Sequence, residues 1–366
     1  YGLLGKEETG PQGQPGPPEP PLRKPLPAVR GVALAVLAIV VVLPVIHVVA
    51  PSIVGDFTLV LGIEILIFVL FAAALHFIMG PGGMVSFGHA AYFGGGAYAV
   101  ALAVKYLDPP FEVVFWAAPL GGALLALIFG WFCVRLSGVY FAMLTLAFAQ
   151  IAWAIVFQDM PTSVARIFAD PMAPPPDPIT GGDDGILNVW PARWASPRIA
   201  YYYLTVVMVI GSLVLLRAAA YAPFGQALRA GRDSPLRAAA IGIDLKRHQW
   251  AAFVLSGAMA GLAGSLFVFS KGSVFPTAME IARSFDALLM VLLGGVQSLF
   301  GPIIGAASFT WLADAFSRLE YWRFLMGIVL PQGLAGFAQT PIGRRLGLSR
   351  GEEAEPEVPT KLEARA

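Results

Sequence analysis

The chain of 366 residues is 57% hydrophobic and 13% charged, and its formal net charge is +1 at pH 7. Soluble globular proteins are about 45–50% apolar and about 25% charged, so this composition excludes an ordinary soluble domain and indicates a lipid bilayer as the solvent. The nearly neutral charge gives no indication of a nucleic-acid partner. The single cysteine, Cys133, excludes a disulfide framework.

Long apolar runs follow one another along most of the chain. About 20 apolar residues cross a hydrocarbon core, so we expect transmembrane helices at 29–50, 57–79, 87–105, 113–134, 138–158, 199–216, 249–270, 285–299, 301–316 and 321–339. The sequence therefore predicts an all-α polytopic membrane protein with about ten transmembrane helices. The segments 285–299 and 301–316 are short, so they are alternatively one broken or re-entrant hairpin, which gives about eight to ten crossings.

Composition divides the chain into three parts. Residues 1–28 are rich in proline and glycine, and residues 341–366 carry mixed charges, so we expect both ends to be disordered tails. The transmembrane domain is expected over 29–340. The loop 217–248 is basic, whereas the loop 159–197 is acidic and rich in proline. Because basic loops stay in the cytoplasm, we expect 217–248 and both termini inside and 159–197 outside.

The second predicted span contains Glu64 near its middle. An ionisable group at this depth is costly, so Glu64 is a candidate pathway residue, and a buried pair with another group is the alternative. A glycine-rich break follows this span and leads into the next one. Glycines at a helix break free backbone groups that protein or a water-filled cavity must satisfy.

Polar side chains accompany the break at a spacing of three residues. We expect these side chains to share one helical face and to line a translocation pathway; the alternative is tight packing with a satisfied histidine at the helix start. The pathway candidates of this segment are Gly82, Gly83, Ser86, His89 and Tyr92.

The outer loop contains a short run of glycine and aspartate. Thr180, Gly181, Gly182, Asp183 and Asp184 are candidate functional residues there, and a plain turn is the alternative. Further along, small residues recur at four-residue spacing over 256–265. Such a face suits close helix packing, either at a seam between subunits or inside one chain.

The cytoplasmic loop is the most informative segment. Asp233 or Ser234 can cap a helix that begins at Pro235, and Gly242 can end it. A short helix that projects into the cytoplasm suits docking on a partner, whereas a solvated connector is the alternative. The candidate docking residues are Arg229, Arg232, Asp233, Pro235, Ala239, Ala240 and Gly242.

Several catalytic signatures are absent from the sequence. The phosphate-binding pattern GxxxxGK[ST] does not occur, and neither do HExxH, CxxC or GxSxG. We therefore expect no catalytic, cofactor or metal site, and a transporter built on this chain must take its energy from another subunit or from an ion gradient.

Five motifs in order resemble the M-type permease of the branched-chain amino-acid (LivHMGF-like) ABC importers. The resemblance covers about Leu59 to Gln339 and rests on the runs 86–94, 138–148, 180–185, 223–244 and 294–305. It implies that the cytoplasmic loop couples to an ATPase. It also implies an H-type permease partner, two ATPase subunits, a periplasmic substrate-binding protein and a bacterial inner membrane.

Some positions differ from that family, and they leave the solute open. Gly83 stands where the family often has glutamine, His76 stands where asparagine is common, and the outer loop is longer at 160–178. Related permeases carry urea, amides or aromatic acids. An ion-coupled secondary transporter using Glu64, His76 and Asp286 is the other alternative, whereas a membrane-embedded enzyme has no supporting residues.

Overall fold

The computed structural model of the chain describes residues 41–49, 55–107, 109–168, 178–296 and 300–315. Residues 41–49 are helical. The further helices are α2 (Asp56–Met79), α3 (His89–Leu107), α4 (Phe111–Val114), α5 (Ala117–Cys133), α6 (Gly138–Phe157), α7 (Met160–Phe168), α8 (Arg198–Tyr221), α9 (Pro223–Asp233), α10 (Pro235–Ala240), α11 (Leu245–Lys271), α12 (Ile281–Gly294) and α13 (Gly301–Ala315). Two strands of two residues, β1 (Ile186–Leu187) and β2 (Ser273–Val274), pair antiparallel. The all-α class is confirmed.

Five helical stretches in the described ranges are long and apolar enough to cross a membrane. They are α2, the stretch from α4 to α5, α6, α8 and α11. Each coincides with a predicted span within a few residues. The helices α3, α12 and α13 occupy three further predicted spans, the span 29–50 is described only in part, and 321–339 lies outside the described residues. The count of ten crossings thus stays a prediction.

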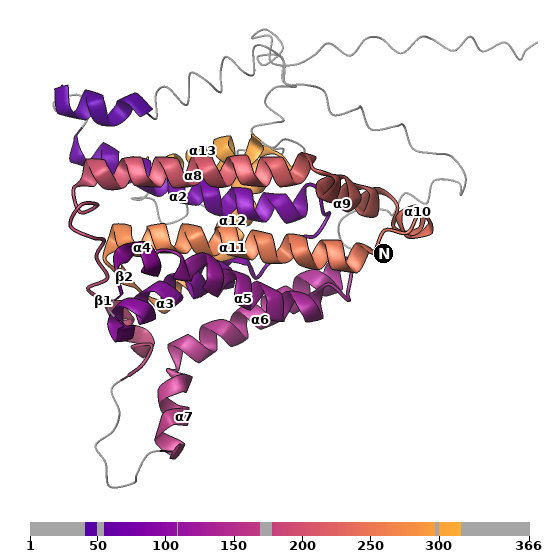
Figure 1. Cartoon of the computed structure of the whole chain (residues 1–366), viewed down its shortest axis with the longest axis horizontal. Coiled ribbons are helices and arrows are strands. Elements are labelled where there is room, and N and C mark those ends of the chain that lie inside the picture. Colours follow the sequence, from indigo (N-terminus) through magenta and orange to yellow (C-terminus); the bar gives the residue numbers. More distant parts are fainter. Residues whose placement is uncertain (1–40, 50–54, 108, 169–177, 297–299, 316–366) are drawn as a thin grey trace, which may run out of the picture.

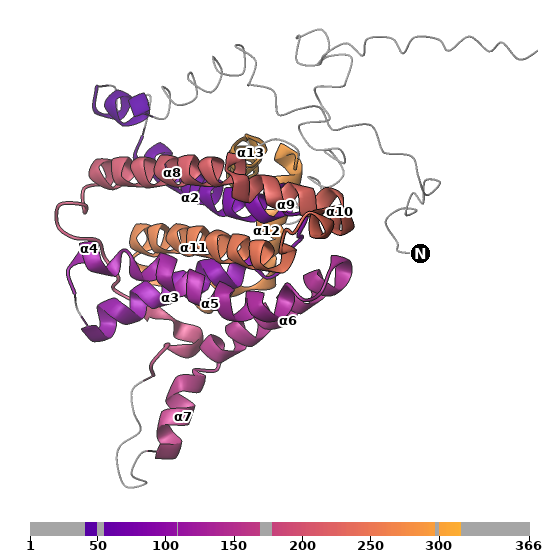
Figure 2. The same ribbon diagram turned by 45° about the vertical axis from the view of Figure 1, so that its right-hand side comes forward.

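Helix α11 lies at the centre of the bundle and packs against α2, α3 and α5. Its side chains Phe253 and Leu266 are fully buried. Figure 1 shows α9 and α10 at one end of the long helices and β1 and β2 at the other end, and Figure 2 shows α9 and α10 together at the same end. The basic loop and the acidic outer loop therefore lie at opposite ends, in agreement with the sidedness expected from their charges.

Glycines bring α3, α5 and α11 into direct backbone contact. A Cβ atom on Gly96 would lie 2.4 Å from the Cα atom of Gly261, and one on Gly122 would lie 2.3 Å from the carbonyl oxygen of Gly257. No side chain fits at these positions. The small-residue face of α11 thus packs inside this chain, which is the second of the two readings given for it.

The helices α12 and α13 form a hairpin. Helix α12 has 14 residues and is therefore about 21 Å long, which is less than the thickness of a hydrocarbon core. Gly295 ends α12 with φ at 90°. The chain then returns along α12 so closely that a Cβ atom on Gly305 would lie 1.9 Å from the carbonyl oxygen of Met290. This geometry favours the hairpin alternative over two separate crossings.

Candidate coupling surface and pathway residues

Two short helices, α9 and α10, lie within the loop 217–248, which the sequence predicts to be cytoplasmic. The sequence predicts α10 but not α9, which begins at Pro223 and packs the buried side chain of Leu228 back onto the bundle. Gly231 also lies so close to Leu245 that a Cβ atom would be 2.4 Å from that side chain. Helix α9 therefore anchors the loop to the start of α11.

Helix α10 presents apolar side chains to its surroundings. It begins at Pro235 as predicted. Leu236 is 86% exposed and Ile241 is 75% exposed, whereas Ala238 is buried beneath them. Large apolar side chains that are exposed on a helix outside the membrane indicate a partner surface.

The ends of α10 differ from the prediction in one respect. Gly242 follows the helix with φ at 87°, as expected of a glycine that ends a helix. The predicted side-chain cap is wrong, because neither Asp233 nor Ser234 makes a capping hydrogen bond. Asp233 instead accepts hydrogen bonds from Arg232. Ala239 and Ala240 are exposed beside the apolar side chains.

Arg232 turns inward, away from the exposed face of α10. Its Nη1 atom donates a hydrogen bond to the carbonyl oxygen of Gly80 at 2.8 Å, and its Nε atom donates to Oδ1 of Asp233 at 2.9 Å. Its side chain is 25% exposed. Arg229 lies beside the ring of Tyr221, 5.6 Å from the centroid. Arg232 therefore connects the cytoplasmic helices to the end of α2, a contact that the sequence did not indicate.

The glycine-rich break lies directly under this arginine. Gly83 has φ at 64°, and a Cβ atom there would lie 2.6 Å from Cγ of Arg232. A Cβ atom on Gly82 would meet the carbonyl oxygen of Ile78 at 2.6 Å. Both glycines thus allow a tight turn with an arginine side chain packed on it.

The three polar pathway candidates lie in the interior of the bundle. Helix α3 begins at His89, so Ser86 precedes the helix and the expected shared helical face is wrong. All three side chains are buried. Nε2 of His89 lies 3.3 Å from Oγ of Ser256, and the ring of Tyr92 meets Phe253 edge to face. Packing between α2, α3 and α11 accounts for them here, and their role in a pathway stays a prediction.

Glu64 has a counter-ion in the same chain. Its Oε2 atom lies 3.0 Å from Nζ of Lys271 at the end of α11, and the side chains of Glu64 and Lys271 are 30% and 40% exposed. The pairing expected of a carboxylate within a span is therefore observed, between α2 and α11.

The outer loop is held by Asp159, which the sequence did not single out. The backbone N–H groups of Ile179 and Thr180 donate to its carboxylate, as does the hydroxyl of Thr180. Burial by itself would raise the pKa of Asp159, but these bonds and one from Thr162 lower it below its ordinary value. The charged form is thus the one that holds the turn.

The Gly-Asp run forms a tight turn, as the plainer of the two readings expects. Gly181 and Gly182 have positive φ, and Asp183 and Asp184 are exposed within a 3₁₀ turn over Gly182–Asp184. The turn leads into β1. In the described residues, no group of three or more His, Cys, Asp or Glu side chains is placed to hold a metal ion.

Comparison with known proteins gives consistent matches. Residues 57–331 match the family described as branched-chain amino acid transport system / permease component. The chain is 26% identical over 355 residues to the high-affinity branched-chain amino acid transport system permease protein LivM of Escherichia coli (strain K12), with 90% of this chain and 82% of the relative covered. The LivM of Salmonella typhimurium matches to the same extent.

A second kind of permease matches over a shorter region. The probable branched-chain amino acid transport permease protein LivH of Methanocaldococcus jannaschii is 35% identical over 164 residues, with 40% of this chain and 50% of the relative covered. No solved structure matches the chain.

Proposed function

The chain belongs to the branched-chain amino acid transport permease family, and on that basis we propose that it is the M-type subunit of an ABC importer that brings branched-chain or related amino acids into the cytoplasm. The similarity to LivM over 90% of the chain supports this subunit type. The importer resides in the bacterial inner membrane.

We infer the partners from the same relationship. An H-type permease completes the transmembrane pathway, two ATPase subunits supply the energy, and a periplasmic binding protein delivers the solute. The partial match to a LivH protein, over 40% of this chain, supports a second, related permease as the partner. In this arrangement α9 and α10 face the ATPase.

The exposed apolar side chains of α10 carry the proposal. Leu236 lies in the first turn of α10 and Ile241 directly follows the helix, whereas Ala238 of the same helix is buried. Burying one such side chain against a partner contributes about 1.5–3 kcal/mol. The burial of both side chains against the ATPase is therefore enough to make its binding depend on this helix. Substitutions of these exposed side chains should leave the folding of the membrane-embedded helices unchanged.

The test is ATPase co-purification and solute uptake in variants of α10. We expect Leu236→Asp and Ile241→Asp to reduce recovery of the ATPase and to abolish uptake, with normal amounts of the subunit in the membrane. Leu187→Asp is the matched control, because Leu187 is 59% exposed at the opposite end. Wild-type uptake in both α10 variants contradicts the proposal.

The solute requires its own assay. Proteoliposomes that contain the assembled importer and its binding protein are expected to accumulate leucine, isoleucine and valine in an ATP-dependent manner. Accumulation of urea, an amide or an aromatic acid in their place identifies the related permeases as the correct branch. Uptake driven by an ion gradient without ATP identifies a secondary transporter, an alternative that the pairing of Glu64 with Lys271 disfavours.

A further inference from the structure

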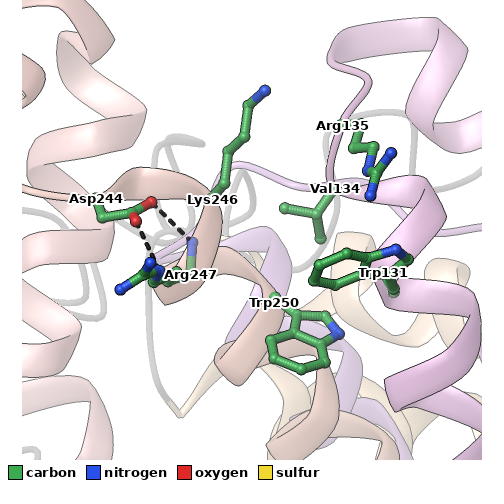
Figure 3. Close-up of a pocket in the computed structure, with 8 residues that line it drawn as sticks. Trp131, Val134, Arg135, Asp244, Lys246, Arg247 and Trp250 are labelled. Atoms are coloured by element: carbon green, nitrogen blue, oxygen red, sulfur yellow. Dashed lines mark hydrogen bonds and ion pairs between the residues drawn. The ribbon is translucent and has the colours of Figure 1, made fainter.

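A cavity of about 450 Å³ lies between the ends of α5 and α11 (Figure 3). These are the ends of the two helices that lie nearest α9 and α10 in Figure 1. The basic loop 217–248 leads into α11 at this end. Because basic loops stay on the cytoplasmic side, the cavity is at the level of the headgroups of the inner leaflet. None of its lining residues takes part in the proposed coupling surface.

Two cations at the cavity have no acidic partner among the described residues. Arg135 and Lys246 are both exposed, and the Arg135 guanidinium lies over the ring of Trp131, 4.8 Å from its centroid. The neighbouring Arg247 differs, because its Nε atom pairs with Oδ2 of Asp244 at 2.9 Å. Counting only the residues that the structure describes, the cavity therefore carries two positive charges without a counter-ion beside one neutralised pair.

Two indole rings form the apolar part of the same cavity. Trp131 and Trp250 meet edge to face with their centroids 5.6 Å apart, and Nε1 of Trp250 donates to the carbonyl oxygen of Leu127 at 3.0 Å. In Figure 3 both rings lie below Arg135 and Lys246. Tryptophan favours the boundary between headgroups and acyl chains. The cations therefore match the charged headgroup of a phospholipid, and the indole rings match the start of its acyl chains.

We propose that this cavity binds an anionic phospholipid of the inner leaflet. Arg135 and Lys246 contact the headgroup phosphate, and Trp131 and Trp250 pack against the glycerol and the first methylene groups. The arrangement of cations above two indole rings decides between two possible ligands. A free phosphate ion uses the cations but gains nothing from the two indoles, whereas a lipid uses both. A bound lipid of this kind connects α5 to α11 where the loop to α9 and α10 begins.

The test is lipid binding to the purified full-length chain, measured by native mass spectrometry. We expect dioleoyl-phosphatidylglycerol to bind more tightly than dioleoyl-phosphatidylcholine. Each basic residue near a membrane surface contributes about fivefold to the attraction of anionic lipid. Arg135→Gln and Lys246→Gln are therefore each expected to weaken phosphatidylglycerol binding about fivefold and to leave phosphatidylcholine binding unchanged.

A control and four possible outcomes make the test decisive. Arg217→Gln removes a cation that lies beside Tyr221 at the end of α8, and it is expected to leave lipid binding unchanged. Equal affinity for the two lipids, or unchanged binding in both cavity variants, overturns the proposal. Displacement of the lipid by equimolar inorganic phosphate identifies a free-anion site, and loss of the lipid on assembly with the partner subunits identifies a protein contact. Either result also overturns it.

Discussion

Arg232 and Gly80 are 152 positions apart in the sequence, yet Nη1 of Arg232 donates a 2.8 Å hydrogen bond to the carbonyl oxygen of Gly80. This bond joins α9 to the turn that ends α2. A movement of the cytoplasmic helices therefore acts directly on the backbone of the glycine-rich break. Arg232 is a positioning residue in this arrangement, since it holds the two segments together within the chain.

Arg232→Ala is expected to uncouple transport from ATP hydrolysis. A hydrogen bond to a charged group contributes about 1.5–3 kcal/mol, so its loss should lower uptake at least about tenfold. ATPase binding should persist, because Leu236 and Ile241 are untouched. Uptake and ATP hydrolysis measured in the same proteoliposomes check this, with Arg232→Lys intermediate and Arg217→Ala as the control. Wild-type uptake in the alanine variant contradicts a positioning role.

Two substitutions of Gly242 are expected to distinguish the effect of backbone strain on stability from the effect of a side chain on ATPase binding. None of the residues that the structure describes lies within 4 Å of a Cβ atom there, although φ is at 87°. Asparagine tolerates positive φ better than valine does. Gly242→Asn should therefore leave the melting temperature of the isolated subunit unchanged and yet reduce ATPase recovery, whereas Gly242→Val should lower both. Normal recovery of the ATPase with Gly242→Asn would mean that the ATPase does not contact the chain at Gly242.

Glu64→Gln is expected to keep uptake within about twofold of the wild type. Oε2 of Glu64 accepts a hydrogen bond from Nζ of Lys271 at 3.0 Å, and the carbonyl oxygen of a glutamine side chain can accept the same bond. Lys271→Gln should have the same small effect, and the double variant should behave like either single one. The pH dependence of uptake is the decisive measurement. Complete loss of uptake in Glu64→Gln, with normal assembly, indicates a proton relay instead.

Asp159→Asn is expected to loosen the outer turn at neutral pH. The pKa of Asp159 is lowered in the folded protein. Its contribution to the stability of the folded turn is therefore complete above the ordinary pKa of about 3.9, and this contribution is lost as pH falls through the lowered pKa of the folded state. Amide hydrogen exchange at 179 and 180 should be about tenfold faster in this variant at pH 7. Asp184→Asn is the control, since Asp184 is exposed. Equal protection in both variants contradicts the clamp.

Local patterns in the sequence predicted local structure well. The predicted span 57–79 is α2 at 56–79, and the helix expected from Pro235 to Ile241 is α10 with Gly242 in the left-handed region behind it. Such features depend on neighbours within a few residues, so one sequence suffices to indicate them.

Contacts across long separations were not predictable in this way. The inward turn of Arg232, the clamp by Asp159 and the burial of His89 beside Ser256 each join segments that meet only in the folded bundle. The position of Arg232 beside the expected docking helix made it a candidate for contact with an external partner. Similarly, the spacing of Ser86 and His89 suggested one helix face, because the sequence does not reveal that the helix begins only at His89.

The direct backbone contacts among Gly96, Gly122, Gly257 and Gly261 restrict how the protein can change shape. Sliding of packed helices needs side chains that can change rotamer between two arrangements, and none exists at these positions. Helices α3, α5 and α11 should therefore rotate together as a rigid body during alternating access. The hinges then fall on either side of that body, at the glycine break under Arg232 and at Gly272, where α11 ends with φ at 69°.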